Sequence, residues 1–390
     1  MEAVERCLDL LDDETMTQLA SRLENAMKTA IGLPSNVACA RILVSFSTRH
    51  NQTFRPHSDR FLKLMEKRVI DRNDTISKSY AEAAGYVSRV ASDDQILQLI
   101  KYSKHLYFEL EEDRHRIASG DIVYAMSKHA TDRFNSFASD ILPFIFVAKH
   151  DSNEHVKELF QNTWNENVGG SRAVLLYLKE IMSLSQAHLD SPRWVLKHTA
   201  SRAIADACTA LALPTEGISK SNAGIIWPAL QKALGGESWE GKEVVLAAFV
   251  RFVEKGSDFW KAEAKIGSEI TKIIVREAKR QNAGYRQYAI RDLGKVSAAR
   301  TDIDMSQTVL EIVESVVEEL AVAKDDDAME IDGGDAAKDE KVRDKTLAGA
   351  AESLADAVNV ELVQDKSKLA AIIEANSLFA NAGCSSSRSR

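Results

Sequence analysis

Residues that make tight turns are scarce in this chain of 390 residues, which contains only six prolines and 18 glycines. A fold of many short β-strands needs such residues at its frequent turns, so their scarcity argues against a β-rich protein. Ala, Leu, Glu, Lys and Ser dominate instead, and the first four of these are strong helix formers. The composition therefore favours an all-α fold.

Cysteine is also scarce, and its placement gives no sign of a metal site or of a disulfide framework. The four cysteines, Cys7, Cys39, Cys208 and Cys384, lie far apart in the sequence. No CxxC pair and no Cys/His cluster with zinc spacing occurs. We therefore expect free thiols in a reducing compartment.

Long apolar runs and an excess of basic residues are absent as well. The longest fully apolar run is 141–148, whereas a membrane-spanning helix needs about 20 residues. The N-terminal sequence MEAVERCLDLLDDE is acidic and does not look like a secretory signal. The net charge of −8 argues against a role in binding nucleic acid. We expect a soluble protein of the cytoplasm and nucleus, with no nucleic acid bound and no membrane insertion.

The length and the apolar periodicity indicate either several domains or one repeat array, since a single core stops growing near about 250–300 residues. Apolar side chains recur with helical spacing almost throughout, for example in 93–112 and 241–256. No stretch shows the sustained alternation of a half-buried strand. We predict helices near residues 14–31, 36–49, 58–70, 74–91, 93–111, 114–130, 132–149, 153–165, 170–189, 192–211, 220–234, 240–256, 258–281, 283–299 and 304–323, with two more at 342–358 and 361–380. The short linkers between most of them predict antiparallel neighbours.

Acidic residues recur near the starts of several helices. Three of them, Asp71, Asp151 and Asp190, are followed five residues later by the β-branched residues Ile76, Val156 and Val195. We predict that the acidic residue caps the helix and that the β-branched residue enters the core.

The acidic anchors also define a repeat. Anchors near residues 71, 112, 151, 190, 237 and 280 are spaced by 39–47 residues, which is the interval of HEAT and armadillo repeats. Small residues in the middle of these helices, at 81–85 and 200–207, allow neighbouring helices to approach closely. We therefore predict an α-solenoid of antiparallel helix pairs.

Two apolar helices contain a proline, Pro143 in ILPFIFVAKHD and Pro228 in IIWPALQKAL. Proline inside a helix removes a hydrogen bond and bends the axis, and the first helices of HEAT repeats commonly carry such a kink. The alternative is that each proline lies in the first turn of its helix, where it is tolerated.

Residues 324–341, KDDDAMEIDGGDAAKDEK, hold eight acidic residues and no aromatic one. This composition predicts a disordered insertion, either a solvated loop or a regulatory segment that binds a partner. The helical pattern resumes at Val342. The expected domains are a HEAT-like α-solenoid over 1–323, the acidic insertion over 324–341, terminal helices that close the solenoid over 342–380, and a disordered tail over 381–390.

One cluster of possible metal ligands occurs at a predicted turn. His150, Asp151, Glu154 and His155 lie close together, but the histidines are five residues apart. Two ligands on one helix face need a spacing of four. Polar residues are expected at such a turn, so we predict no metal site there.

A glycine pair precedes another predicted helix. The backbone amides of Gly169–Arg172 suggest phosphate binding, but no strand precedes them and no GxxxxGK[ST] motif is present. A loop in which Ser171 caps the helix is the simpler interpretation. No GxSxG, HExxH, kinase or Rossmann signature occurs. We predict that the chain is not an enzyme and has no catalytic, cofactor-binding or metal-binding residues and no cofactor. The residues that bind partners stay unassigned.

Two further features suggest contacts with partners. The basic segment 47–60, STRHNQTFRPHSDR, is interpreted as a solvated turn between helices, with contact to an acidic surface or nucleic acid as the alternative. The tryptophans are predicted to pack between helices, although an exposed one would be a candidate hot spot. They are Trp164, Trp194, Trp227, Trp239 and Trp260.

Three stretches resemble a known family beyond the generic repeat. They are RHRIASGDIVYAMSKHATDRFNSFASDILPFIFVAKHD (114–151), LFQNTWNENVGGSRAVLLYLKEI (159–181) and SWEGKEVVLAAFV (238–250). The second carries Trp164, Gly170, Tyr177 and Leu178 in a WxE…G…LYLxE pattern, and the third carries Trp239, Gly241, Lys242 and Glu243 in a WxGKE pattern. In these features the chain is similar to the C-terminal region of the proteasome adaptor and scaffold protein family, the very large HEAT-repeat proteins of the 26S proteasome. The resemblance covers roughly 33–360 and is most specific over 114–260.

The resemblance implies a function and a partner. Such proteins bind the proteasome, bridge its regulatory and core particles, and monitor its assembly, and none is an enzyme. Family members are several times longer, so we expect this chain to be a fragment or a truncated gene model whose Met1 is not the true start. A HEAT-type nuclear-transport receptor, or a HEAT scaffold subunit of a kinase or phosphatase, is the alternative with the same fold.

Overall fold

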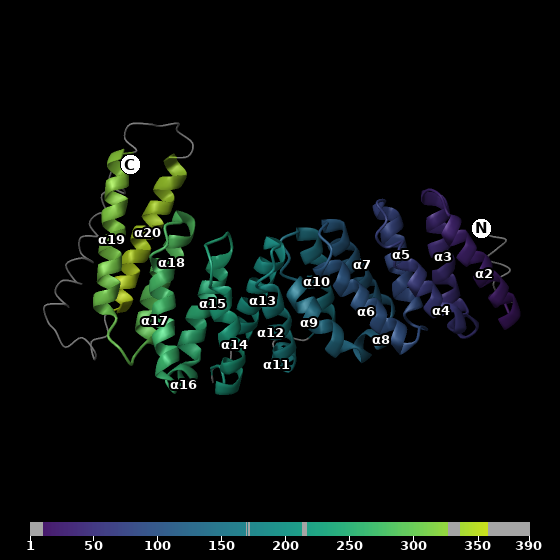
Figure 1. Ribbon diagram of the computed structural model, residues 1–390, viewed down its shortest axis with the longest axis horizontal. Coiled ribbons are helices and arrows are strands. Elements are labelled where there is room, and N and C mark those ends of the chain that lie inside the picture. Colours follow the sequence, from purple (N-terminus) through teal and green to yellow (C-terminus); the bar gives the residue numbers. More distant parts are fainter. Residues whose placement is uncertain (1–10, 169, 171, 213–216, 327–335, 358–390) are drawn as a thin grey trace. The chain divides into compact units, whose positions relative to one another are not determined.

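The computed structural model describes residues 11–168, 170, 172–212, 217–326 and 336–357. Within these ranges the regular elements are α-helices and no strand occurs, which confirms the predicted all-α class (Figure 1). The helices are α2 (Asp13–Thr29), α3 (Leu33–Arg49), α4 (Asn51–Met65), α5 (Asp74–Val87), α6 (Asp93–Phe108), α7 (Asp113–His129), α8 (Thr131–Ser136), α9 (Ala138–Ala148), α10 (Glu154–Asn167), α11 (Arg172–Leu176), α12 (Leu178–His188), α13 (Trp194–Ala212), α14 (Lys220–Ala233), α15 (Lys242–Lys255), α16 (Ser257–Trp260), α17 (Ala264–Ala278), α18 (Ala283–Ala299), α19 (Ser306–Asp326) and α20 (Ala336–Ala357).

Most predicted helices agree with the structure within a few residues, but three of them are each divided in two. The predicted helix 132–149 is α8 followed by α9, 170–189 is α11 followed by α12, and 258–281 is α16 followed by α17. At the first division Phe137 has φ −110° and ψ 22°, so the chain leaves helical geometry for one residue.

The interpretation of 47–60 as a turn is wrong. Helix α3 continues to Arg49 and α4 begins at Asn51, so the two helices join at the single residue His50, which has φ −126° and ψ 42°. The apolar residues of α4 explain this, because they recur with helical spacing and are buried. They are Phe54, Phe61, Leu62 and Met65.

The chain divides into two compact units, which are described separately. Unit 1 comprises Met1–Leu184 and Ser191–Thr199. In it α2, α4, α6 and α9 pack side by side as one layer, and α3, α5, α7 and α10 pack as a second layer. Each helix of the first layer also contacts the next helix along the chain, which lies in the second layer. Unit 1 is therefore a stack of helix pairs, as an α-solenoid requires.

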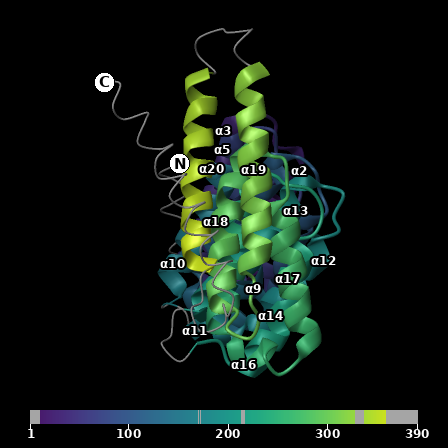
Figure 2. The ribbon, with the colours of Figure 1, turned by 90° about the vertical axis from the view of Figure 1, so that its left-hand side faces the viewer.

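Unit 2 comprises Ser185–Asp190 and Ala200–Arg390 and has the same construction. Helices α15, α18 and α20 pack side by side, while α14 contacts α16 and α16 contacts α17. The pairs α14–α15, α17–α18 and α19–α20 are each formed by two helices that follow one another in the chain. The short α16 lies between the first and the second pair. Figure 2 shows α19 and α20 side by side, in front of α18.

The predicted acidic caps are displaced by two residues in the structure. The caps of α5 and α10 are Asn73 and Asn153, whose side-chain oxygens accept from the backbone N–H groups of the first turn. Asp71 and Asp151 lie two residues earlier and accept from the backbone N–H of those asparagines, at 2.8 Å in each case. A carboxylate therefore orders the turn, and an asparagine caps the helix.

The residues predicted to enter the core five positions after the anchors do so in two of three cases. Ile76 and Val156 are buried. At the third position Val195 is only half-buried, and its neighbour Leu196 takes the buried place.

The predicted repeat interval is visible in the side-chain hydrogen bonds between helices. Arg68 donates to the carbonyl of Met27, 41 residues earlier in the sequence. Arg133 donates to Ala91 and Arg276 donates to Leu234, each across 42 residues. Each arginine thus ties one helix pair to the preceding pair, and the separations lie within the spacing of 39–47 residues found among the anchors.

Small residues do allow the close helix packing that the sequence predicts. A Cβ placed on Gly85 in α5 would lie 2.5 Å from the carbonyl oxygen of Ala125 in α7, closer than atoms can pack.

Pro143 and Pro228 lie inside α9 and α14, beyond the first turn of each helix. The interpretation that places each proline in the first turn is therefore wrong.

The acidic segment lies only partly within the described residues. Helix α19 extends to Asp326 and α20 begins at Ala336, so the helices overlap both ends of the predicted insertion. Residues 327–335, the predicted helix 361–380 and the predicted tail lie outside the described residues.

Candidate functional site

The predicted cluster at the turn before α10 is structural. Asp151 is buried, and its carboxylate lies 3.0 Å from Nε of Arg116 and accepts a hydrogen bond of 2.7 Å from the hydroxyl of Tyr107. Because the carboxylate has both of these partners, its charge is neutralised inside unit 1. Within the described residues, no group of three or more His, Cys, Asp or Glu side chains is placed to hold a metal.

Of the predicted glycine pair, Gly170 lies within the described residues and has a backbone explanation. Gly170 has φ 76°, a left-handed conformation that favours glycine. The helix that follows, α11, has five residues. Gly169 and the predicted cap Ser171 lie outside the described residues.

The tryptophans divide into buried and exposed members. Trp164, Trp227 and Trp260 are buried, as the packing prediction requires, and Trp239 is half-buried. Trp194 at the start of α13 is 63% exposed, and the ammonium group of Lys197 lies 5.3 Å from its ring centroid.

The WxGKE pattern contributes its lysine to a buried ion network in unit 2. Gly241 has φ 103° and ends the turn before α15, and Lys242 follows as a fully buried residue. Its Nζ lies 3.1 Å from the carboxylate of Glu277, which also contacts Arg280 at 2.6 Å and the Tyr285 hydroxyl at 3.0 Å. The pattern thus fixes the α14–α15 turn against α17.

The charges of this network perturb one another. Burial lowers the pKa of Lys242 to about 8, although the Glu277 carboxylate opposes the shift. Burial alone would raise the pKa of Glu277, but the hydrogen bond from Arg280 and the charge of Lys242 outweigh it and hold the pKa below its usual value. Glu277 is therefore ionised, and the network positions helices rather than protons.

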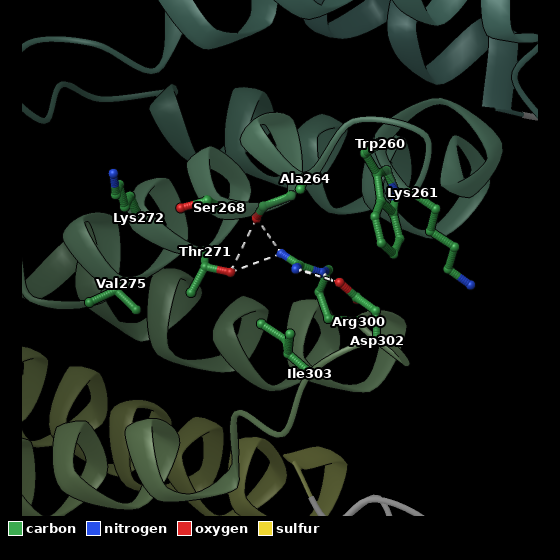
Figure 3. A pocket seen from close by; sticks show the side chains of 11 residues that line it. Trp260, Lys261, Ala264, Ser268, Thr271, Lys272, Val275, Arg300, Asp302 and Ile303 are labelled. Atoms are coloured by element: carbon green, nitrogen blue, oxygen red, sulfur yellow. Dashed lines mark hydrogen bonds and ion pairs between the residues drawn. The ribbon is translucent and has the colours of Figure 1, made fainter.

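A groove with a volume of about 810 Å³ lies over α17 in unit 2. Its walls come from α16, from one face of α17 and from the turn between α18 and α19 (Figure 3). The residues of α17 that line it recur with helical spacing on one face. They are Ala264, Gly267, Ser268, Thr271, Lys272 and Val275.

Arg300 holds the middle of this groove in place. Its guanidinium donates from Nη1 to the carbonyl of Gly267 and to the Thr271 hydroxyl, the latter at 2.8 Å. Nε and Nη2 donate to the two carboxylate oxygens of Asp302, each at 2.8 Å (Figure 3). Such a bidentate pair is among the stronger hydrogen-bonded contacts in proteins. The side chain of Arg300 is only 3% exposed, so the groove has a rigid base.

Trp260 closes one wall of the groove. Its indole Nε1 donates to the carbonyl of Val253 at 2.9 Å, which fixes the ring. The Arg300 guanidinium carbon lies 5.1 Å from the ring centroid, and Nζ of Lys261 lies 5.4 Å from it. These cation–π contacts contribute about 0.5–2 kcal/mol each and hold both cations at the groove.

Three of the residues that line the groove, Lys261, Lys272 and Arg300, are cationic, and one, Asp302, is acidic. The hydrogen bond from Arg300 holds the pKa of Asp302 below its usual value, so this pair is neutral overall. Lys261 and Lys272 are exposed, and Figure 3 places them at opposite ends of the groove. Figure 3 places Ala264 and Ile303 between these lysines and Val275 at the Lys272 end, and the three residues supply apolar surface. The groove therefore combines a buried, hydrogen-bonded base with apolar surface and exposed cations.

Sequence reasoning did not find this groove. Its α17 face consists of small and polar residues, which read as an ordinary solvated surface, and Arg300 lies 33 residues from Gly267. The feature of the sequence that points to the groove is the glycine at 267, because a Cβ there would lie 3.2 Å from Nη2 of Arg300.

No helix among the described residues has the length and apolar character needed to cross a membrane.

Two family models match the chain, one at each end. The model described as the HEAT-repeat domain of the proteasome adapter and scaffold protein ECM29 matches residues 1–108. The model described as the C-terminal ARM-like repeats of ECM29 matches residues 253–385. Together they cover more than half of the chain, and they flank the region 114–260 that carries the specific sequence resemblance.

Relatives with assigned names agree with these matches. The human proteasome adapter and scaffold protein ECM29 is 29% identical over 300 residues, which cover 74% of this chain and 16% of that protein. The proteasome component ecm29 of Schizosaccharomyces pombe is 28% identical over 296 residues, with 76% of this chain and 17% of that protein covered. The proteasome component ECM29 of Saccharomyces cerevisiae is 26% identical over 291 residues, with 73% and 15% covered.

This chain spans about a sixth of the length of each of these relatives. The matched residues make up about three quarters of this chain. Matched family models at both ends, relatives of the same family in three organisms and a HEAT-like α-solenoid place this chain in the ECM29 family.

Proposed function

We propose that this chain is a non-catalytic scaffold that associates with the 26S proteasome, where it bridges or stabilises the regulatory and core particles and monitors their assembly. The observation that carries the proposal is the pair of ECM29 family models matched at its two ends. The human relative is named a proteasome adapter and scaffold protein, and the yeast relatives are named proteasome components.

The architecture supports a binding role. Within the described parts of each unit the helix pairs pack mainly against adjacent pairs, which leaves extended surface free for large partners. The polar cluster at Asp151 is occupied by internal partners, and the groove over α17 contains no catalytic arrangement. The proposal therefore includes no enzymatic activity, no cofactor and no bound nucleic acid. It places the protein in the cytoplasm and nucleus. The comparisons give no support to the nuclear-transport alternative.

Binding is tested with the tagged chain immobilised and exposed separately to purified 26S proteasome, isolated core particle and isolated regulatory particle. We expect retention of the 26S assembly and of at least one of its two parts. An unrelated HEAT scaffold with a similar net charge serves as the matched control. Retention no greater than that of the control would contradict the proposal.

Bridging is tested independently of retention. Purified 26S proteasome is transferred to a buffer without ATP, and its separation into core and regulatory particles is followed on native gels. We expect the chain to slow this separation when it is present in excess. An unchanged rate of separation, combined with normal retention, would leave an adaptor that binds but does not bridge.

A further inference from the structure

The groove over α17 has the size and the surface of a peptide-binding site. Its volume of about 810 Å³ falls within the range of about 300–1,000 Å³ that is usual for ligand sites. Its base is rigid because Arg300 is tied to both α17 and Asp302. A preformed site of this kind loses little conformational entropy on binding.

The apolar part of the groove extends from Ile303 near its middle to Val275 at the Lys272 end (Figure 3). Val275 and Ile303 are each half-buried within unit 2, so part of each side chain remains open to solvent. An apolar side chain from a partner would cover this surface and exclude water from it. Apolar anchors in preformed pockets supply much of the binding energy at protein interfaces.

The charge of the groove selects the partner. Lys261 and Lys272 lie at its opposite ends, and no salt bridge within the described residues involves either of them (Figure 3). The Lys261 ammonium donates to the neutral hydroxyl of Thr301 at 3.1 Å, and its charge helps to lower the pKa of Asp302. Because Arg300 is neutralised by Asp302, the groove carries a local positive charge on a chain whose net charge is −8. Carboxylates at both ends of a bound segment would complement it.

We propose that this groove binds an acidic segment of a partner protein, with an apolar side chain over Ile303 and carboxylates paired with Lys261 and Lys272. This inference rests on the proposed scaffold function, since it assigns one of the surfaces that such a scaffold needs. The occupant is a protein segment because an apolar anchor is required between the two charged ends.

The test is a fluorescence anisotropy titration with two synthetic 12-residue peptides that carry fluorescein. One has Asp and Glu on both sides of a central Leu-Phe pair, and the other has Lys at every acidic position. We expect the acidic peptide to bind the full chain and the basic peptide to bind at least tenfold more weakly. Equal binding of the two peptides, or no binding of the acidic one, would overturn the proposal.

Two matched charge reversals locate the binding. Lys272→Glu places a carboxylate at the end of the groove, whereas Lys345→Glu makes the same change at an exposed position of α20 that does not line it. We expect the first to weaken binding of the acidic peptide at least tenfold and the second to leave it within about twofold. Equal effects would place the peptide elsewhere, against the proposal. Far-UV circular dichroism and thermal melting confirm that both variants are folded.

The outcomes of these tests can be distinguished from failure of the proposed scaffold function. The peptide titration uses no proteasome, so its result is independent of whether the chain retains proteasomes. Sedimentation of the free chain tests occupation by a second copy. If the chain forms a dimer that Lys272→Glu dissociates, a second copy is the occupant and the assignment to a partner protein is overturned.

Discussion

The ammonium nitrogen of Lys242 lies 3.1 Å from the carboxylate of Glu277, and neither side chain is exposed to solvent. A buried carboxylate among cations is stable only while the charges balance, because removal of one partner leaves the others uncompensated. Glu277 is the common partner of Lys242, Arg276 and Arg280. The loss of Glu277 would therefore break more ion pairs of the network than the loss of any one of the three cations.

We predict that Glu277→Gln lowers the free energy of unfolding of unit 2 by about 3–5 kcal/mol, since it leaves buried cations without a counter-charge. The measurement is urea denaturation of the full chain, followed by circular dichroism. Glu314→Gln, at an exposed position of α19, is the control and changes the free energy by less than about 0.5 kcal/mol. Similar curves for the two variants would show that the network contributes nothing.

Arg300 provides a second prediction about the base of the groove. A lysine retains the charge but cannot donate at the same time to Gly267, Thr271 and both oxygens of Asp302. We expect Arg300→Lys to lower the free energy of unfolding by about 2 kcal/mol, as for other broken buried hydrogen-bonded pairs. The control is Arg291→Lys, where the arginine and its partner Glu352 are each 53% exposed. An exposed pair of this kind contributes less than about 1 kcal/mol, so equal losses would contradict the argument.

Close helix packing gives a third prediction, in which the same substitution has opposite effects at two glycines. A Cβ on Gly85 would lie 2.5 Å from the backbone of Ala125, so Gly85→Ala must push α5 and α7 apart. A Cβ on Gly224 in α14 would meet Phe259 at an ordinary 3.6 Å. We expect a loss of about 1–3 kcal/mol at Gly85 and a gain of about 0.4–1 kcal/mol at Gly224. Thermal melting distinguishes these signs, and a stabilised Gly85→Ala would refute the packing argument.

The helical class and the repeat interval could be predicted from sequence because both depend on local periodicity. The apolar period of α6 and α15 is directly visible, and the anchors at Asp71 and Asp151 mark successive repeats. The exact cap could not be found in this way. An aspartate and an asparagine two residues apart both suit a helix start, and only the backbone geometry shows that Asn73 and Asn153 are the caps.

The groove and the ion network were inaccessible to sequence reasoning for a different reason. Arg300 and Gly267 meet across 33 residues, and Lys242 and Glu277 meet only because α15 and α17 belong to neighbouring helix pairs. Lys272 and Ser268 look like any solvated helix positions until Ile303 is placed opposite them. The basic residues of 47–60 led to the wrong prediction of a turn, because they drew attention away from the apolar residues that α4 buries.

The last prediction concerns Asp121 in α7, whose Oδ2 is buried without a hydrogen-bond partner. Burial raises its pKa to about 6, although the charge of Lys78 opposes the shift. In the unfolded chain the pKa is near the ordinary 3.8. Between about pH 4 and pH 6 the folded state therefore binds more protons than the unfolded state, and stability falls as the pH rises. The full cost is present above pH 6.

Asp121→Asn removes this cost because the amide carries no charge to desolvate. We expect the variant to exceed the wild type in free energy of unfolding by about 2–3 kcal/mol at pH 7.5 and to match it near pH 4. Urea denaturation at half-unit pH intervals measures both curves. Glu158→Gln, at an exposed position of α10, serves as the control and should run parallel to the wild type at every pH. If Asp121→Asn also runs parallel, the carboxyl is hydrated in solution and its burial does not govern the stability of unit 1.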